Sequence, residues 1–249
     1  MIKVDKQDYN RLTDYLLSNY MYYIHGALRF YDNASVYVDN LDNINGVVYV
    51  NQFGQEYDIC LYSRDNAFLD QAYKLFIRGK KVFFSATEQS VFDYIGSKRK
   101  LRRYTLCSTV INNGGQPPEY TVPNGLTMDK VRNEYLGVVV EHHEYYGSID
   151  DIRQSVDRYP SVALYNSEGK MVSWVLVHPE GSIGPLFTLK EYRGKGLAPI
   201  VLAELIRQLL SQHHIVYSYI VKGNTSSEVL LKKVCGVFAP IDICYGMTL

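Results

Sequence analysis

Short apolar segments separated by polar turns dominate the first part of the chain. The segments at 34–40, 46–52 and 56–63 are rich in Val and Tyr and are separated by Asp, Asn and Gly. This pattern predicts three consecutive strands that form a meander. Before them, apolar residues recur at helical spacing, which predicts an amphipathic helix from about Asp5 to Asn19.

The meander is followed by a helix, a strand and a second helix. The helical stretches lie near 66–78 and 87–97, around the short apolar strand KVFFSA. The regular pattern stops at 111–120, where paired glycines free the backbone and paired prolines remove hydrogen-bond donors. We therefore predict an α/β (α+β) protein of two domains, residues 1–115 and residues 116–249.

The second half alternates between strands and helices. The first predicted element is a helix with an N-cap at Ser148 and Asp151, whose Ile149, Ile152 and Val156 share one face. It is followed by a hairpin over 160–179, a strand at 182–190, a long helix from Gly196, a strand at 215–223, a helix from about Ser226 and an extended tail at 238–249. In the long helix, Leu197, Val201, Leu205 and Leu209 share one face. We predict that this stripe packs in the core and has no chemical role.

Composition narrows the class of protein. Among 249 residues, 26 Lys and Arg balance 26 Asp and Glu, and 47% of the residues are hydrophobic, as in a folded globular protein without a basic surface for nucleic acid. The four cysteines are far apart, which predicts buried reduced thiols. No apolar run approaches the roughly 18 residues of a membrane helix, and the N-terminus lacks an apolar signal core. We expect a cytoplasmic protein with no membrane or nucleic-acid partner.

Candidate chemistry lies in the segment TLKEYRGKGLAP, at 188–199. A predicted strand runs into a loop with Gly194 and Gly196, and a helix follows. Unpaired backbone N–H groups in such a loop, together with the positive end of the helix dipole, can bind a phosphate. The mononucleotide motif GxxxxGK[ST] is absent, and Pro199 stands where GxGxxG needs its last glycine. The segment therefore predicts an anion site of another type.

The pattern Arg193-x-x-Gly196-x-Ala198 resembles the acyl-CoA pyrophosphate loop of the GNAT acyltransferase superfamily. Within it the chain is most similar to the glycine N-acyltransferase-like (FR47-like) group. The segments that carry this second resemblance are SWVL at 173–176, TLKEYR at 188–193, VYS at 216–218, Asn224 and, in the first half, IHGALRFYD at 24–32. The resemblance implies a tandem GNAT-like fold: two similar halves, each a mixed twisted sheet flanked by helices, of which only the second keeps a CoA loop.

The resemblance also implies a mechanism and a set of contacts. An amine attacks the thioester of acetyl-CoA or another acyl-CoA directly, with no covalent enzyme intermediate and no metal. The implied contacts with CoA are the strand positions Leu186 and Thr188 for the pantetheine arm, the loop residues Arg193, Gly194, Lys195, Gly196, Leu197 and Ala198 for the pyrophosphate, and Asn224 and Ser227 after the next strand. Ser227 fits a helix cap equally well.

The chain departs from the family at the catalytic base. The glutamate proposed as base in glycine N-acyltransferases corresponds here to Ser182, which cannot act as one, and Lys232 stands where many GNAT proteins have a tyrosine acid. An alkylamine titrates about three units above neutral pH, so a base should assist its attack. Glu180 and His178, in the turn before the CoA strand, are the candidates; both are also ordinary turn residues.

Three functions stay open at this point. The first is an acyl-CoA N-acyltransferase that acts on a small amine, such as glycine or another amino acid. The second is a non-catalytic acyl-CoA-binding protein, which Ser182 favours. The third is an N-acetyltransferase of proteins or peptides. The histidine pair in EHHEYY lacks HExxH spacing, so we expect no metal site there, and we expect a monomer or a weak dimer.

Overall fold

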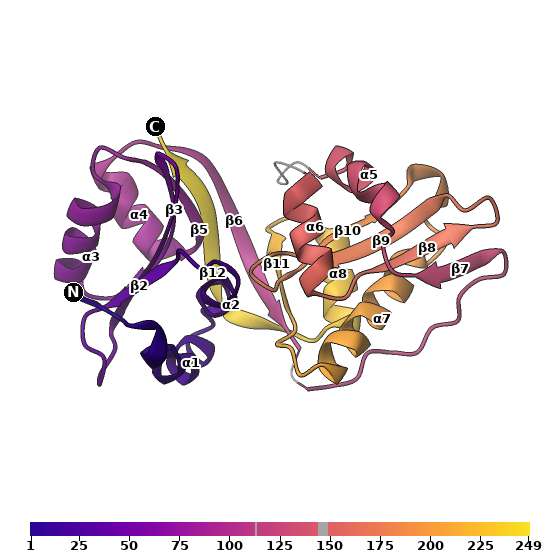
Figure 1. Cartoon of the computed structure of the whole chain (residues 1–249), viewed down its shortest axis with the longest axis horizontal. Helices are drawn as coiled ribbons and strands as arrows, with labels where there is room; N and C mark the ends of the chain where they lie inside the picture. The colour runs from indigo at the N-terminus through magenta and orange to yellow at the C-terminus, as the bar shows by residue number, and fades with distance from the viewer. Residues whose placement is uncertain (113, 144–148) are drawn as a thin grey trace. The chain divides into compact units, whose positions relative to one another are not determined.

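The computed structural model is a mixed α/β structure and describes residues 1–112, 114–143 and 149–249 (Figure 1). The strands are β1 (Ile2–Lys3), β2 (Ser35–Val38), β3 (Gly46–Phe53), β4 (Glu56–Ser63), β5 (Lys81–Glu88), β6 (Leu101–Ile111), β7 (Leu126–Asp129), β8 (Val162–Asn166), β9 (Met171–Val177), β10 (Ile183–Thr188), β11 (Tyr217–Val221) and β12 (Val237–Thr248). The α-helices are α1 (Tyr9–Ser18), α2 (Tyr22–Phe30), α3 (Asn66–Ala72), α4 (Gln89–Lys98), α5 (Leu136–Glu141), α6 (Ile149–Arg158), α7 (Leu197–Ser211) and α8 (Thr225–Val234). Single turns of 3₁₀-helix lie at η1 (Lys6–Asp8), η3 (Asn133–Tyr135) and η4 (Lys190–Tyr192), and a π-helical turn at η2 (Tyr73–Ile77).

The described strands form two sheets. The larger sheet has the order β1-β2-β3-β4-β5-β12-β6-β11, and the smaller has the order β10-β9-β8-β7. Strands β2, β3 and β4 pair as antiparallel neighbours, whereas β4 and β5 are parallel. Every pair in the smaller sheet is antiparallel. Strands β10 and β11 each lie at an edge of their sheet and do not pair with one another.

The chain folds into two compact units. The first comprises Met1–Thr109, Val221–Gly223 and Ala239–Leu249, and the second comprises Val110–Ile220 and Asn224–Phe238. The C-terminal strand β12 therefore adds most of its length to the first unit, beside β5 (Figure 1). That the two sequence halves 1–115 and 116–249 are separate GNAT-like domains stays a prediction.

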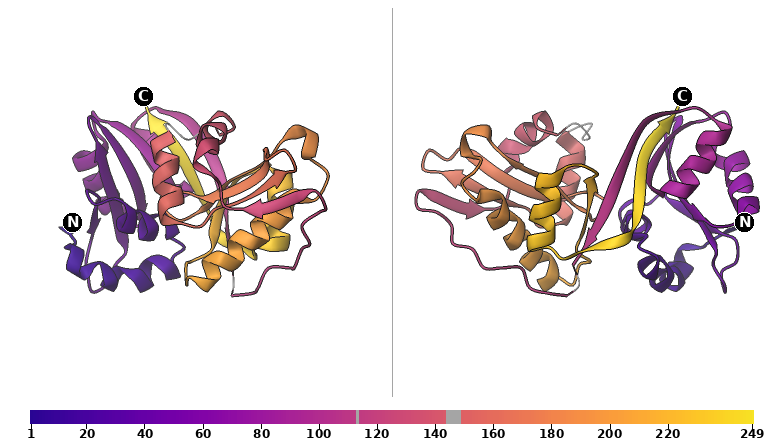
Figure 2. Two further views of the ribbon diagram at one scale, coloured as in Figure 1. Left: turned by 45° about the vertical axis from the view of Figure 1, so that its right-hand side comes forward. Right: turned by 180° about the vertical axis from the view of Figure 1, so that it is seen from behind.

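In the first unit, helices cover both faces of the sheet (Figure 2). Val48 of β3 packs with Phe68 of α3 and Phe92 of α4 in one apolar core. Tyr49, the next residue of β3, points to the opposite face, where its ring meets that of Tyr23 on α2 at 5.9 Å. This alternation follows from the two-residue period of a strand.

In the second unit, the strands β8 and β9 lie between two helical layers. Val162 and Leu164 of β8 pack against α7, whereas Ala163 and Tyr165 pack in the core that α5 and α6 cover. The apolar stripe of α7 is confirmed as core, because its four residues are at most 2% exposed. Glu204 and Arg207, on the other face of α7, form an ion pair of 2.9 Å.

Most of the elements predicted from the sequence are confirmed. The meander is β2, β3 and β4, the hairpin is β8 and β9, and the strand before the glycine loop is β10. The Ser148 cap lies outside the described residues. The four cysteines are buried and free, as expected. Among the described residues, no helix combines the length and apolarity needed to cross a bilayer.

Several elements escaped the sequence analysis. The helix α2 was not predicted; six successive residues from Tyr22 to Ala27 are buried in it. The strands β6 and β7 and the helix α5 were also missed. Of these, β7 and α5 span only four and six residues, too few to establish a period.

Because the apolar stripe of α7 packs in the core, truncating one of its side chains should lower the stability of the protein strongly. Leu205→Ala should lower the free energy of unfolding by about 2–5 kcal/mol, because Leu205 is fully buried and its removal leaves a cavity. Urea denaturation measures this change. Val229→Ala, at a position on α8 that is 64% exposed, is the control and should shift the value by less than about 0.5 kcal/mol. Equal effects would contradict the packing described here.

Candidate functional site

The turn between β10 and α7 depends on two glycines. After η4 the chain turns through Gly194 and Gly196, whose φ angles are 76° and 72°. L-amino acids other than glycine are strained in this left-handed region. A Cβ at either position would meet nothing within 4 Å, so the requirement for glycine comes from the backbone angle and not from crowding. The space beside the loop is open.

Most backbone N–H groups of this loop have no acceptor in the part of the chain that the structure describes. Arg193 N donates to Lys190 O at 3.3 Å. Among the residues that the structure describes, no acceptor receives a bond from the N–H groups of 194–198, and no side chain caps α7 at Gly196. Pro199 lies in the first helical turn, where its missing N–H costs nothing. The first turn of a 15-residue helix and the loop before it therefore present a group of unpaired donors to an anion.

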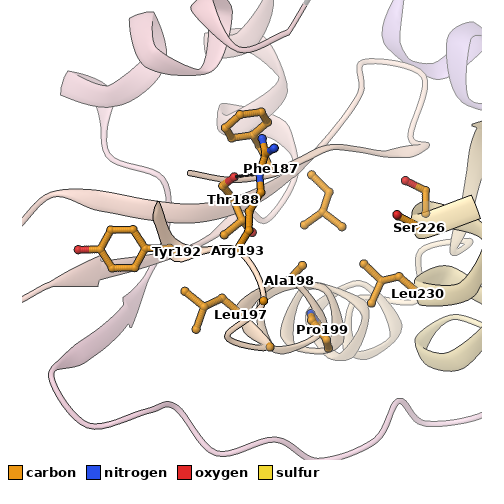
Figure 3. Close-up of a pocket in the computed structure, with 13 residues that line it drawn as sticks. Phe187, Thr188, Tyr192, Arg193, Leu197, Ala198, Pro199, Ser226 and Leu230 are labelled. Atoms are coloured by element: carbon orange, nitrogen blue, oxygen red, sulfur yellow. Dashed lines mark hydrogen bonds between the residues drawn. The ribbon is translucent and has the colours of Figure 1, made fainter. Parts of the chain in front are cut away.

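These donors border a pocket of about 320 Å³ (Figure 3). The pocket is lined by Leu186, Phe187, Thr188, Tyr192, Arg193, Gly194, Gly196, Leu197, Ala198, Pro199, Ser226, Ser227 and Leu230. Phe187 and Thr188 of β10 lie on one side, and Ser226 and Leu230 of α8 lie on the other. Both sides thus combine apolar side chains with hydroxyl groups, and the loop end carries N–H donors and a guanidinium group.

The pocket exists because β10 lacks a strand partner on this side. Its bonded neighbour is β9, and the strand that follows in the chain, β11, belongs to the other sheet. Two side chains of β11 bridge to the start of β10: Ser218 Oγ donates to Ile183 O at 2.9 Å, and Tyr217 Oη donates to Glu180 O at 2.6 Å. The pairing of β10 with β9 shifts register between Ile183 and Leu186. The two strands are therefore tied at one end only.

The two basic side chains of the loop lie in different places. Arg193 Nε donates to Thr188 O at 3.0 Å, and its guanidinium lies 5.2 Å from the centre of the Phe187 ring, at the pocket. Lys195 is exposed, with Nζ 4.7 Å from the centre of the Tyr192 ring, and it does not line the pocket. Arg193 is therefore the better placed of the two to contact an anion held by the loop.

Of the two candidate residues after β11, Asn224 caps a helix and Ser227 lines the pocket. Asn224 Oδ1 accepts a bond from Ser227 N at 3.2 Å, so Asn224 is the N-cap of α8. Asn224 is exposed and does not line the pocket, whereas Ser227 does. The sequence left a helix-capping role open for Ser227, but Asn224 is the residue that caps α8.

His178 and Glu180 lie in a tight turn before β10. Gly181 N donates to His178 O, and His178 N donates to Ser182 O, both at 2.8 Å. Ser182 is buried, and its Oγ donates to Glu180 Oε1 at 2.6 Å. The His178 ring lies against β10 so closely that a Cβ on Gly184 would approach its Nε2 to 2.5 Å. Neither candidate base lines the pocket itself.

Burial shifts the two candidate bases in opposite directions. Burial raises the pKa of Glu180 to about 7, although the hydrogen bond from Ser182 acts the other way. Burial lowers the pKa of His178 to about 4, so the imidazole is neutral at pH 7. A carboxyl group that exchanges its proton near neutral pH is suited to general acid–base chemistry.

The sequence analysis missed part of the site. It named Leu186, Thr188, Arg193, Gly194, Gly196, Leu197, Ala198 and Ser227, all of which line the pocket. It did not name Phe187, Tyr192, Pro199, Ser226 or Leu230, which line it too. Three consecutive residues of β10, Leu186, Phe187 and Thr188, line the pocket. The alternation of side chains along a strand therefore could not distinguish the pocket residues from the core residues in the sequence.

The first unit has a similar order of strand, turn, helix and strand but no open loop. Strands β4 and β5 pair from Glu56 to Ile59, and beyond that Leu61 N donates to the buried hydroxyl of Thr87 at 3.2 Å. At the start of α3, the Asp65 carboxylate accepts a bond from Ala67 N at 2.9 Å. The start of α3 thus has a side-chain cap from Asp65, whereas no side chain caps α7.

Metal chemistry finds no support among the described side chains. Within residues 1–112, 114–143 and 149–249, no three His, Cys, Asp or Glu side chains come together as ligands of a metal ion. His142 of the EHHEYY segment stacks edge-on against Trp174 and Phe187.

Known proteins resemble part of this chain in sequence. The family model described as FR47-like protein matches residues 161–239. Glycine N-acyltransferase of Bos taurus is 26% identical over 132 residues, which cover 52% of this chain and 45% of the bovine protein. The match thus spans less than half the length of that curated relative.

Solved structures resemble the whole chain in fold. A Drosophila protein superimposes with a TM-score of 0.76 at 16% identity, over 97% of this chain and 88% of its own. A tandem GNAT protein from the clavulanic acid biosynthesis pathway gives 0.55 at 13% identity, over 100% and 97%. A GCN5-related N-acetyltransferase-like protein of Streptococcus suis gives 0.55 at 16%, over 90% and 92%. The expected tandem GNAT-like fold is confirmed.

The raised pKa of Glu180 predicts a pH-dependent stability. The pKa of Glu180 in the folded protein, about 7, lies above its ordinary value of 4.5. The stability that the protonated carboxyl group contributes is therefore fully present below pH 4.5 and is lost as pH rises through 7. Glu180→Gln removes this loss, so its unfolding free energy should rise relative to that of the unaltered protein between pH 5 and pH 8. Urea denaturation at several pH values measures the difference.

Glu168→Gln is the matched control, because Glu168 is exposed in the hairpin turn. The difference in unfolding free energy between Glu168→Gln and the unaltered protein should not change over the same pH range. If the difference for Glu180→Gln is equally independent of pH, the carboxyl group of Glu180 is not held in a buried environment.

Proposed function

We propose that this chain transfers an acyl group from CoA to the amine of a small acceptor, such as glycine or another amino acid; the match of residues 161–239 to the FR47-like family model supports this proposal. The observation that carries the proposal is the set of unpaired N–H groups at 194–198, beside a strand with a free edge. The resemblance to glycine N-acyltransferase supports this acceptor class. A cytoplasmic location and a monomer or weak dimer stay predictions.

The pocket supports a binding mode for acyl-CoA. The diphosphate would accept bonds from the N–H groups of 194–198, with charge from Arg193 at the pocket and from Lys195 outside it. The pantetheine arm would lie along Leu186 and Thr188. Ser227 would contribute a hydroxyl group, and Asn224, whose Oδ1 caps α8, would contribute only its Nδ2.

The reaction needs one base and one proton donor. The amine nitrogen attacks the thioester carbon, the C–S bond breaks, and the amine proton passes to the base while the thiolate leaves. We assign the base to Glu180, because a pKa of about 7 makes it an effective acceptor at neutral pH, whereas His178 with a pKa of about 4 is a weak one. Lys232 is exposed, so water would protonate the thiolate.

A second candidate function rests on Ser182. This residue stands where the family has a glutamate and is 2% exposed, so it offers neither charge nor access. A protein that binds acyl-CoA but lacks turnover would have the same pocket. Thiol release separates the two functions.

Binding depends on the backbone of the loop. Gly196→Ala should weaken the affinity for CoA at least about tenfold, because alanine in the left-handed region costs about 1–2 kcal/mol and the loop relaxes away from its present shape. Isothermal titration measures the dissociation constant.

Gly169→Ala is the control, since Gly169 has a φ of 79°, has open space around it and lies in the β8–β9 turn. It should bind CoA as the unaltered protein does. No CoA binding by the unaltered protein at millimolar concentration would contradict both candidate functions.

Catalysis depends on the carboxylate of Glu180. The unaltered protein should release free thiol from acyl-CoA in the presence of glycine or another small amine, with kcat/KM rising as pH increases through about 7. Glu180→Gln should lower kcat about 100-fold and leave the affinity for CoA unchanged. Glu168→Gln should be as active as the unaltered protein. CoA binding without thiol release, across several acyl chains and amines, would favour the non-catalytic function.

A further inference from the structure

The turn before β10 holds its backbone without help from the Ser182 hydroxyl group. The bonds Gly181 N to His178 O and His178 N to Ser182 O close the turn. From β11, Tyr217 Oη donates to Glu180 O at 2.6 Å. These three bonds involve backbone atoms of the turn and fix the position of the Glu180 backbone.

The carboxylate itself is held by one side chain. Ser182 Oγ donates to Glu180 Oε1 at 2.6 Å, a short bond of the kind that a hydroxyl makes to a carboxylate. Ser182 is 2% exposed and begins the chain's entry into β10. A flexible glutamate side chain two residues earlier is thereby tied to the rigid end of a strand.

The Glu180 carboxyl group accepts hydrogen bonds from the Ser182 hydroxyl group and from the backbone N–H of Glu180 itself, so Ser182 is the donor that ties it to another residue. His178 lies on the turn, and the His143 ring lies 5.7 Å from that of His178. Tyr159 donates to Pro179 O, and Tyr217 donates to Glu180 O, so both phenols contact backbone oxygens. Within the described part of the chain, no Lys or Arg forms an ion pair with Glu180. Burial and hydrogen bonds, and no charge of a described residue, shift its pKa.

We propose that Ser182 is a positioning residue, whose hydroxyl holds Oε1 of Glu180 at the start of β10 so that Oε2 is presented to accept the proton of the amine. This inference rests on the proposed function, in which Glu180 is the base. It gives the buried serine a role in the reaction, so Ser182 no longer favours a protein without turnover.

Three variants of Ser182 separate this role from a structural one. Ser182→Ala removes the donor, Ser182→Cys keeps the volume with a weak donor, and Ser182→Thr keeps the hydroxyl group. Because a hydrogen bond to the charged form lowers a carboxyl pKa, its loss should move the acid limb of the kcat/KM profile upward by about half a unit or more. We expect Ser182→Ala and Ser182→Cys to show this shift with kcat about tenfold lower and unchanged KM for acyl-CoA, and Ser182→Thr to restore both values.

Ser218→Ala is the structural control, because Ser218 Oγ is also a buried donor to the start of β10 but bonds Ile183 O and not the carboxylate. It should lower the melting temperature without moving the pH profile. An unshifted profile in Ser182→Ala and Ser182→Cys, with the unaltered protein active, overturns the positioning role and leaves the proposed function standing.

A second measurement does not need activity. The carboxyl carbon of Glu180, assigned in a ¹³C spectrum through its loss in Glu180→Gln, reports the titration of this group directly. A higher titration midpoint in Ser182→Ala than in the unaltered protein supports the inference, and equal midpoints overturn it. If the unaltered protein releases no thiol, the proposed function fails, and this titration still decides whether Ser182 holds the carboxylate.

Discussion

The free edge of β10 is the constraint on which the second unit's chemistry depends. A buried strand normally satisfies its backbone groups on both sides, and an unpaired edge is costly unless something covers it. Here β9 bonds one side, and on the other side the only described bridges are the side-chain bonds from Tyr217 and Ser218 at the start of the strand. The remainder of that edge, the loop with its unpaired N–H groups and the first turn of α7 would be open to the acyl-CoA of the proposed function, with its diphosphate at the loop and its arm along the strand.

In the first unit, a similar order of strand, turn, helix and strand has hydrogen-bond acceptors supplied by the protein itself. Thr87 supplies an oxygen to the strand, and Asp65 supplies one to the helix end. An anionic carboxylate at the helix N-terminus is stabilised there by the dipole and would repel a phosphate. The two units therefore differ in strand pairing, since β4 pairs with β5 whereas β10 and β11 do not pair, and in the cap at the helix start, which Asp65 supplies in the first unit only.

Local patterns in the sequence predicted the elements on which the site stands, and long-range contacts decided the rest. Gly194 and Gly196 indicated the loop in the sequence, because a backbone with positive φ requires glycine and glycine is visible in the sequence. Asn224 was expected to contact pantetheine, but its carboxamide caps α8 three residues on, and either role fits an asparagine before a helix. The bond between Ser182 and Glu180 escaped the sequence analysis, because two residues of a turn meet only once the turn's geometry is known. The burial that raises the pKa of Glu180 is likewise a property of the packed structure.

The most direct test of the account is a ¹H–¹⁵N spectrum of the whole chain during titration with CoA. The account predicts that the amide resonances of residues 194–198 shift most and saturate together, because their N–H groups gain the acceptors that the protein does not supply. Amides at the start of α3, where Asp65 is the acceptor, should stay in place. Saturable binding that leaves the resonances of 194–198 unmoved would contradict the central claim.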